Sequence, residues 1–240
     1  MFRVSNDQMQ GFADMARKAE HRRLLRRLRE EQPELTLRMG PGGADELVTH
    51  IVERARAFAF EEPRALDFFL DAVLVLGLEF DRDRRVPWAG ANLAAEELAL
   101  PRRLMNLRTG LERFETAVMA ARPAACARLA ALEPGALPDA TRDADAFWRL
   151  VDAVWPELYA RLNKLYVNGL LLAARGVAEH YRTGPEGVAP ACLAQLFMGV
   201  GCFADPQWRH VLSGVLEVGR AERAAKTFDV TRRWAATVAG

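Results

Sequence analysis

The sequence predicts an all-α protein, a multi-helix bundle made of two similar helical halves. Apolar residues recur at helical spacing along the chain, and no segment alternates apolar and polar residues as a half-buried strand would. Glycine and proline divide the chain into segments of helix length. The stretch 58–88 is echoed within 181–206, which suggests duplication of a helical unit. In this alignment Leu193 and Phe203 stand 123 residues after Leu70 and Phe80.

The first half is expected to span residues 1–133. Its first helix starts at the capping box of Ser5 and Gln8 and runs to about Glu31, because Pro33 cannot continue a helix. A loop is predicted at 38–43 from its glycine and proline content. The other helices of this half are expected at about 44–60, 63–79, 101–121 and 123–132, with a break at Pro87–Gly90. The helix at 63–79 is apolar on almost every side, so it should be the buried centre of this half.

Residues 133–139, rich in proline and glycine, form the predicted linker, and the second half is expected to span 139–240. Its central helix, at about 188–203, is the counterpart of the buried helix in the first half. Asp205 and Pro206 are residue types preferred at the N-cap and the first position of a further helix. The remaining helices are expected at about 141–154, 156–181, 206–218 and 221–238.

The composition argues against some classes of partner. The chain has 240 residues and a formal net charge of +1, so no overall field favours DNA, RNA or an acidic membrane. Neither a secretory signal nor an apolar stretch of membrane-spanning length is visible. The three cysteines, at irregular spacing, fit buried thiols in a reducing compartment. We therefore expect a cytoplasmic protein without a membrane span.

The sharpest polar cluster is formed by Glu79, Asp81 and Asp83, three carboxylates at alternate positions after the buried helix. Oxygen-rich loops of this kind can bind calcium or magnesium, so a metal-dependent hydrolase is one alternative. The favoured interpretation is that the aspartates cap backbone amides in a tight turn and pair with neighbouring arginines. These arginines are Arg82, Arg84 and Arg85. On this interpretation the turn holds no metal and the protein needs no cofactor.

A basic run in the first helix is the strongest local charge feature. Arg22, Arg23, Arg26 and Arg27 cover much of one side of that helix at helical spacing. Such a side could bind phosphate or nucleic acid, which gives a second alternative. Neighbouring glutamates dilute the charge and no aromatic residues are interleaved, so a solvated or internally paired face is favoured over nucleic acid.

The run Gly77-Leu78-Glu79-Phe80-Asp81-Arg82-Asp83, followed by Pro87-Trp88-Ala89, resembles a group of small helical proteins. Their genes lie beside type VI secretion effector and spike genes in proteobacteria. The likeness covers roughly the first hundred residues, with a faded second copy at 181–206. Members of the group typically have proline after the second aspartate, where this chain has Arg84. The resemblance implies an accessory protein for secreted toxins, and it carries over no catalytic residue.

Together these features predict a non-enzymatic protein-binding accessory factor, acting as an adaptor, a chaperone or a neutralising, immunity-type partner. The expected partner is a secreted toxin or a spike component. No catalytic or metal-ligating residue is assigned. Phe80, Trp88 and Phe203 are expected to anchor their turns in the core. The residues expected to contribute to binding are Phe80, Asp81, Asp83, Trp88, Arg22, Arg23, Arg26 and Arg27.

Overall fold

A computed structural model describes residues 6–162 and 164–239 of the chain. These residues form helices joined by short turns, and no strand occurs among them, which confirms the predicted all-α, multi-helix fold. Helix α1 is described from Asn6 onwards, and Ser5 of the predicted capping box lies outside the described residues. Within the same described ranges, no helix combines the length and the apolar character needed to cross a membrane.

Two prolines that the sequence suggested as breaks instead begin helices in the first half. Pro33 is the first residue of α2 and Pro87 the first residue of α5, where the absent amide hydrogen of proline costs no intrahelical bond. The predicted loop at 38–43 is correspondingly shorter, since only residues 40–42 separate α2 from α3. The helices are α1 (Asn6–Glu31), α2 (Pro33–Met39), α3 (Gly43–Ala57), α4 (Pro63–Leu76), α5 (Pro87–Leu93), α6 (Leu100–Ala117) and α7 (Arg122–Ala130).

The second half is more broken than predicted. The helix expected at 156–181 is interrupted after Tyr159, and the helix expected at 206–218 is divided into a 3-10 turn and two short helices. The predicted cap is confirmed, because the Asp205 side chain accepts a hydrogen bond from the Gln207 amide. The elements are α8 (Ala144–Val154), α9 (Pro156–Tyr159), α10 (Lys164–His180), η3 (Pro185–Gly187), α11 (Val188–Met198), η4 (Pro206–Trp208), α12 (Arg209–Leu212), α13 (Gly214–Glu217), η5 (Arg220–Glu222) and α14 (Arg223–Ala239).

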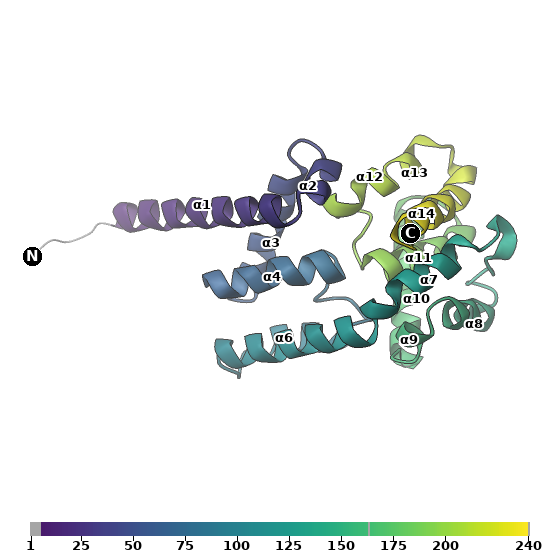
Figure 1. The fold of residues 1–240 in the computed structure, drawn as a ribbon, viewed down its shortest axis with the longest axis horizontal. Helices are drawn as coiled ribbons and strands as arrows, with labels where there is room; N and C mark the ends of the chain where they lie inside the picture. Colours follow the sequence, from purple (N-terminus) through teal and green to yellow (C-terminus); the bar gives the residue numbers. More distant parts are fainter. Residues whose placement is uncertain (1–5, 163, 240) are drawn as a thin grey trace, which may run out of the picture.

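The helices gather in two groups along the molecule (Figure 1). In this view α1, α4 and α6 run roughly parallel at the N-terminal end, and α7 to α14 lie at the other end. Helix α7, which precedes the predicted linker, packs against α14, and Arg232 of α14 donates a hydrogen bond to the carbonyl of Ala130 at 3.0 Å. Helices α4 and α11 supply much of the core, and every residue of α11 is buried.

The C-terminal ends of α4 and α11 meet at two glycines. Gly77 and Gly199 close these helices with φ angles of 99° and 100°, a conformation that favours glycine. A Cβ atom on Gly199 would overlap the carbonyl oxygen of Leu76, and one on Gly77 would lie 3.1 Å from the carbonyl oxygen of Met198. The two backbones therefore approach closely because neither position carries a side chain.

Corresponding features recur along the chain, but not at one constant offset. The turns after α3 and α10 close with equivalent backbone bonds, from Phe60 to Ala55 and from Thr183 to Ala178, 123 residues apart. The helix-starting Pro63 and Pro185, like the two closing glycines, stand 122 residues apart. The aligned partner of Phe80 is therefore Cys202 rather than Phe203. The similarity of the two halves as whole units, and their bounds at 1–133 and 139–240, stay predictions.

Candidate functional site

The three aromatic residues expected to anchor the turns after α4 and α11 are buried to different extents. Phe80 is buried and meets the ring of Phe69 edge-on at 5.4 Å, as expected for a core anchor. Trp88, in the first turn of α5, is half-buried, and its indole packs so closely on α6 that a Cβ atom on Gly110 would overlap it. Phe203 is also only half-buried and lies against Tyr181, with ring centroids 5.1 Å apart.

Asp81 connects the turn to α3. Both of its carboxylate oxygens accept hydrogen bonds from Arg54, and the bond from Nε to Oδ1 is 2.8 Å long. The predicted neighbour Arg82 approaches only to 4.0 Å. The expected pairing within the turn is therefore present for Asp81 only as a long contact, and its main partner is Arg54. The sequence offered no signal for Arg54, because this partner lies 27 residues earlier.

Asp83 behaves as the sequence predicted. It is buried, its Oδ1 accepts the Arg85 amide at 2.8 Å, and its Oδ2 accepts Arg85 Nε at 2.8 Å. The buried Arg85 then donates to the carbonyl oxygens of Leu76 and Leu196, each at 2.7 Å. The Asp83–Arg85 pair thus joins the C-terminal ends of α4 and α11, a role that local sequence could not reveal.

Asp205 makes the corresponding turn in the second half, 122 residues after Asp83. Its carboxylate accepts the amides of Gln207 at 2.9 Å and of Leu78 at 3.0 Å. The Gln207 side chain donates to the carbonyl of Val73 in α4 at 3.2 Å. Burial raises the pKa of Asp205 to about 6, although the hydrogen bonds that it accepts act in the opposite direction. Each turn therefore reaches the helix of the other half.

The structure shows no metal-binding arrangement at Glu79, Asp81 and Asp83, all of which are described. Asp81 and Asp83 are engaged by Arg54 and Arg85, and among the described residues no group of three potential ligands could hold a metal ion. Of the four turn residues expected to bind a partner, Phe80 and Asp83 are buried, whereas Asp81 and Trp88 keep some exposure.

The basic face of α1 is divided between pairing and exposure. Arg23 pairs with Asp67 at 2.7 Å and Arg27 with Asp71 at 2.6 Å, so these two hold α1 on α4, which confirms internal pairing for them. Arg22 and Arg26 are exposed and form no ion pair within the described ranges. The four arginines therefore do not act as one free cationic surface.

The thiols offer no nucleophile. All three cysteines are buried and free, as the sequence predicted. Burial raises the pKa of Cys126 to about 11 and raises those of Cys192 and Cys202 as well. A thiolate is the reactive form of cysteine, so these side chains are inert packing groups at neutral pH.

The N-terminal part of α1 carries apolar side chains that nothing in the described structure covers. Leu24 and Leu28 are fully buried, but Met9, Phe12 and Met15 are 54%, 61% and 58% exposed. Their three-residue spacing places them on one side of the helix. Figure 1 shows this end of α1 running out beyond α4 and α6. The apolar side chains of α1 are therefore covered only along its C-terminal part.

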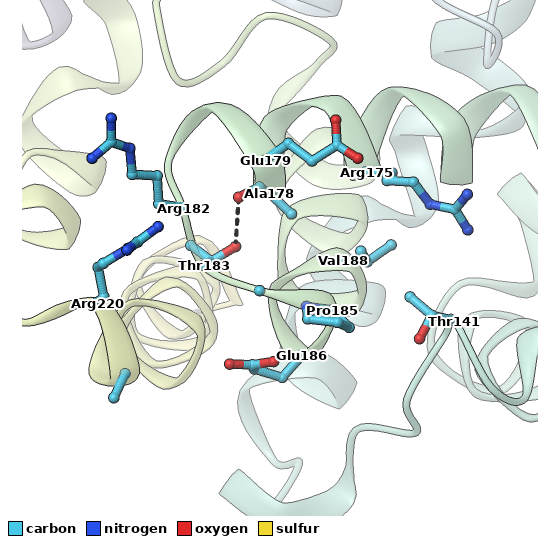
Figure 2. A pocket seen from close by; sticks show the side chains of 12 residues that line it. Thr141, Arg175, Ala178, Glu179, Arg182, Thr183, Pro185, Glu186, Val188 and Arg220 are labelled. Carbon is cyan, nitrogen blue, oxygen red and sulfur yellow. Dashed lines mark hydrogen bonds between the residues drawn. The ribbon is translucent and has the colours of Figure 1, made fainter.

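A cavity of about 750 Å³ lies where the end of α10, the turn into α11 and η5 come together (Figure 2). Arg175, Arg182 and Arg220 line it together with Glu179 and Glu186. All five side chains are exposed, and none takes part in an ion pair in the described part of the chain. Sequence reasoning missed this site because its charges come from separate segments.

Comparisons with protein-family models, curated proteins and solved structures found no match to this chain. The geometry of the molecule is therefore the basis for a functional assignment, together with the motif resemblance.

Proposed function

We propose that this protein binds another protein in the bacterial cytoplasm as an accessory factor of a secreted-toxin system. Its role would be that of an adaptor, a chaperone or a neutralising partner. The observation that supports binding is the uncovered apolar side of α1 at Met9, Phe12 and Met15. The nature of the partner, a toxin or a spike component, is supported by the Phe-Asp-x-Asp motif resemblance alone.

The exposed end of α1 has the properties of a recognition helix. A surface helix normally turns its large apolar residues towards the core, and neighbouring exposed ones mark interaction sites. The C-terminal part of α1 is fixed by buried Leu24 and Leu28 and by the pairs of Arg23 and Arg27 with α4. The free end therefore extends from an anchored helix, which reduces the ordering cost of binding. Met and Phe are well suited to filling a groove on a partner.

Co-purification with the products of the neighbouring genes tests the proposal. The wild-type chain is expected to capture a toxin or spike component, and a variant with Met9→Glu, Phe12→Glu and Met15→Glu is expected to lose it. A matched control replaces three other exposed apolar residues with glutamate: Leu37, Leu172 and Leu216, which are 82%, 68% and 52% exposed. Capture by the α1 variant at the wild-type level, or by neither protein, would refute the proposal.

A further inference from the structure

The cavity at the end of α10 has a counterpart in the first half. A cavity of about 520 Å³ lies at the end of α3 and the start of α4. Several of its wall residues align with wall residues of the cavity at the end of α10, which we call the α10–α11 cavity. The alignment offset is 123 residues before the turn that joins the two helices and 122 residues after it. These pairs are Val52 with Arg175, Arg56 with Glu179, Pro63 with Pro185, and Leu66 with Val188.

A helix covers this place in the first half. Ala16, Arg17 and Glu20 of α1 complete the wall of the smaller cavity. The same helix is held there by Arg23, which pairs with Asp67 and donates to the carbonyl of Pro63 at 3.3 Å. In the second half the wall is completed only by Thr141 and by the 3-10 turn at Arg220 and Ala221. The first half thus shows how a helix sits at such a place. In the second half α14 packs against α11, and the part that stays open is the cavity beside the end of α10.

The charges predict which kind of helix fits the open place. In the first half the helix is basic and α4 supplies Asp67 and Asp71. At the corresponding positions, 122 residues later, the second half has the buried apolar residues Ala189 and Leu193, so α11 supplies no carboxylate there. Its cavity is instead lined by three arginines and two glutamates that form no ion pair in the described chain, so arginine outnumbers carboxylate. Arginine binds carboxylates through paired hydrogen bonds. The first half holds a basic helix, whereas the arginines of the second half favour an acidic one.

The arginines are divided between the two ends of the cavity. Figure 2 shows Arg182 and Arg220 at one end of the cavity, while Arg175 and Thr141 lie at the other. Arg182 follows α10 with a φ angle of 54°, a left-handed conformation that is uncommon for a residue other than glycine. Glu186 is folded back on its own turn, since a Cβ atom on Gly184 would lie 2.7 Å from its Oε2.

We propose that the α10–α11 cavity receives an acidic amphipathic helix of the partner protein. The apolar side chains of that helix would rest on Ala178, Pro185 and Val188, and its carboxylates would pair with Arg182 and Arg220. This inference rests on the proposed protein-binding function and defines the chemistry of one contact. It concerns a surface separate from the exposed end of α1.

Fluorescence anisotropy with two synthetic probes tests the site on the full-length protein. Both probes are amphipathic helices with leucines along one side; glutamates flank the leucines in one and lysines in the other. The glutamate probe is expected to bind, and more weakly as salt is raised. The variant Arg182→Gln with Arg220→Gln is expected to lose at least about tenfold in affinity. The matched control, Arg102→Gln with Arg108→Gln, neutralises two exposed arginines on α6 and should bind as the wild type does.

Equal affinity for the two probes, or equal loss in the two arginine variants, would overturn the proposal. Inorganic phosphate competing fully with the glutamate probe would also overturn it, because the cavity would then be a small-anion site. Concentration-dependent self-association lost in the Arg182 and Arg220 variant would assign the cavity to a second copy of the chain instead. If that variant still captures the toxin partner while the α1 variant does not, the proposed function stands and this inference falls.

Discussion

At the scale of single residues, the turn after α4 separates what local sequence can reveal from what it cannot. The pairing of Asp83 with Arg85 is a contact over two residues, and the spacing predicted it. The pairing of Asp81 with Arg54 depends on how α3 packs on the turn, and nothing near Asp81 indicated it. The hydrogen bond from Arg85 to the carbonyl of Leu196 spans 111 residues, so local sequence could not predict it either. Burial of Phe80 followed from its place at the end of an apolar helix.

Removing the charge of Asp83 should be strongly destabilising. Asp83→Asn leaves the buried Arg85 guanidinium without its counter-ion, and breaking a buried pair in this way costs about 3–5 kcal/mol. The matched change Asp229→Asn, which removes an exposed pair with Arg233, should cost at most about 0.5 kcal/mol. Urea unfolding followed by circular dichroism measures both. Similar midpoints for the two variants would show that the Asp83–Arg85 pair does not hold the turn.

Asp205 gives the protein a defined pH dependence. Because its pKa in the folded state, about 6, lies above the ordinary aspartate value of 3.8, the folded protein binds this proton more tightly than the unfolded chain. The contribution of this group to stability therefore increases as pH falls from 7 through about 6 and levels off below 3.8. Comparing the free energy of unfolding of wild type and Asp205→Asn across this range isolates the effect. Parallel curves for the two proteins would contradict it.

At the scale of elements, the sequence predicted the long helices better than the short ones. Helices α4 and α11 were recognisable because they are apolar on nearly all sides, and burial on all sides is what the structure shows for α11. Helices α2 and α5 were missed because Pro33 and Pro87 were interpreted only as breaks, whereas proline is also favoured at the first helical position. The cavity lined by three arginines is formed by segments that are distant in sequence, so no local pattern predicted it.

The glycines of the helices should respond to substitution in opposite directions. Gly199→Ala is expected to destabilise, because φ is 100° and the new Cβ atom would overlap the Leu76 carbonyl oxygen. Gly176→Ala, within α10 and with no atom within 4 Å of the added Cβ, should stabilise by about 0.5–1 kcal/mol. Thermal unfolding of both variants measures the difference. A Gly199→Ala protein as stable as the wild type would mean that α4 and α11 do not approach as described.

At the scale of the whole molecule, the two groups of helices are joined by contacts that run in both directions. Arg85 of the first turn donates to Leu196 in α11, and Gln207 of the second turn donates to Val73 in α4. The core of each group therefore depends on the turn of the other. The free end of α1 and the cavity beside α11 take no part in these contacts. Neither is needed to complete the core, and this makes both available to a partner.

Titration calorimetry of the full-length protein with its captured toxin or spike partner is the most direct test of protein binding through α1. Replacing Met9, Phe12 and Met15 with glutamate should weaken binding at least about a hundredfold, since central apolar anchors carry most of the binding energy of an interface. The wild-type complex should form with a negative heat-capacity change, because apolar surface is buried. The control variant at Leu37, Leu172 and Leu216 should bind within about twofold of wild type. Equal affinities for the α1 variant and the control would contradict the account.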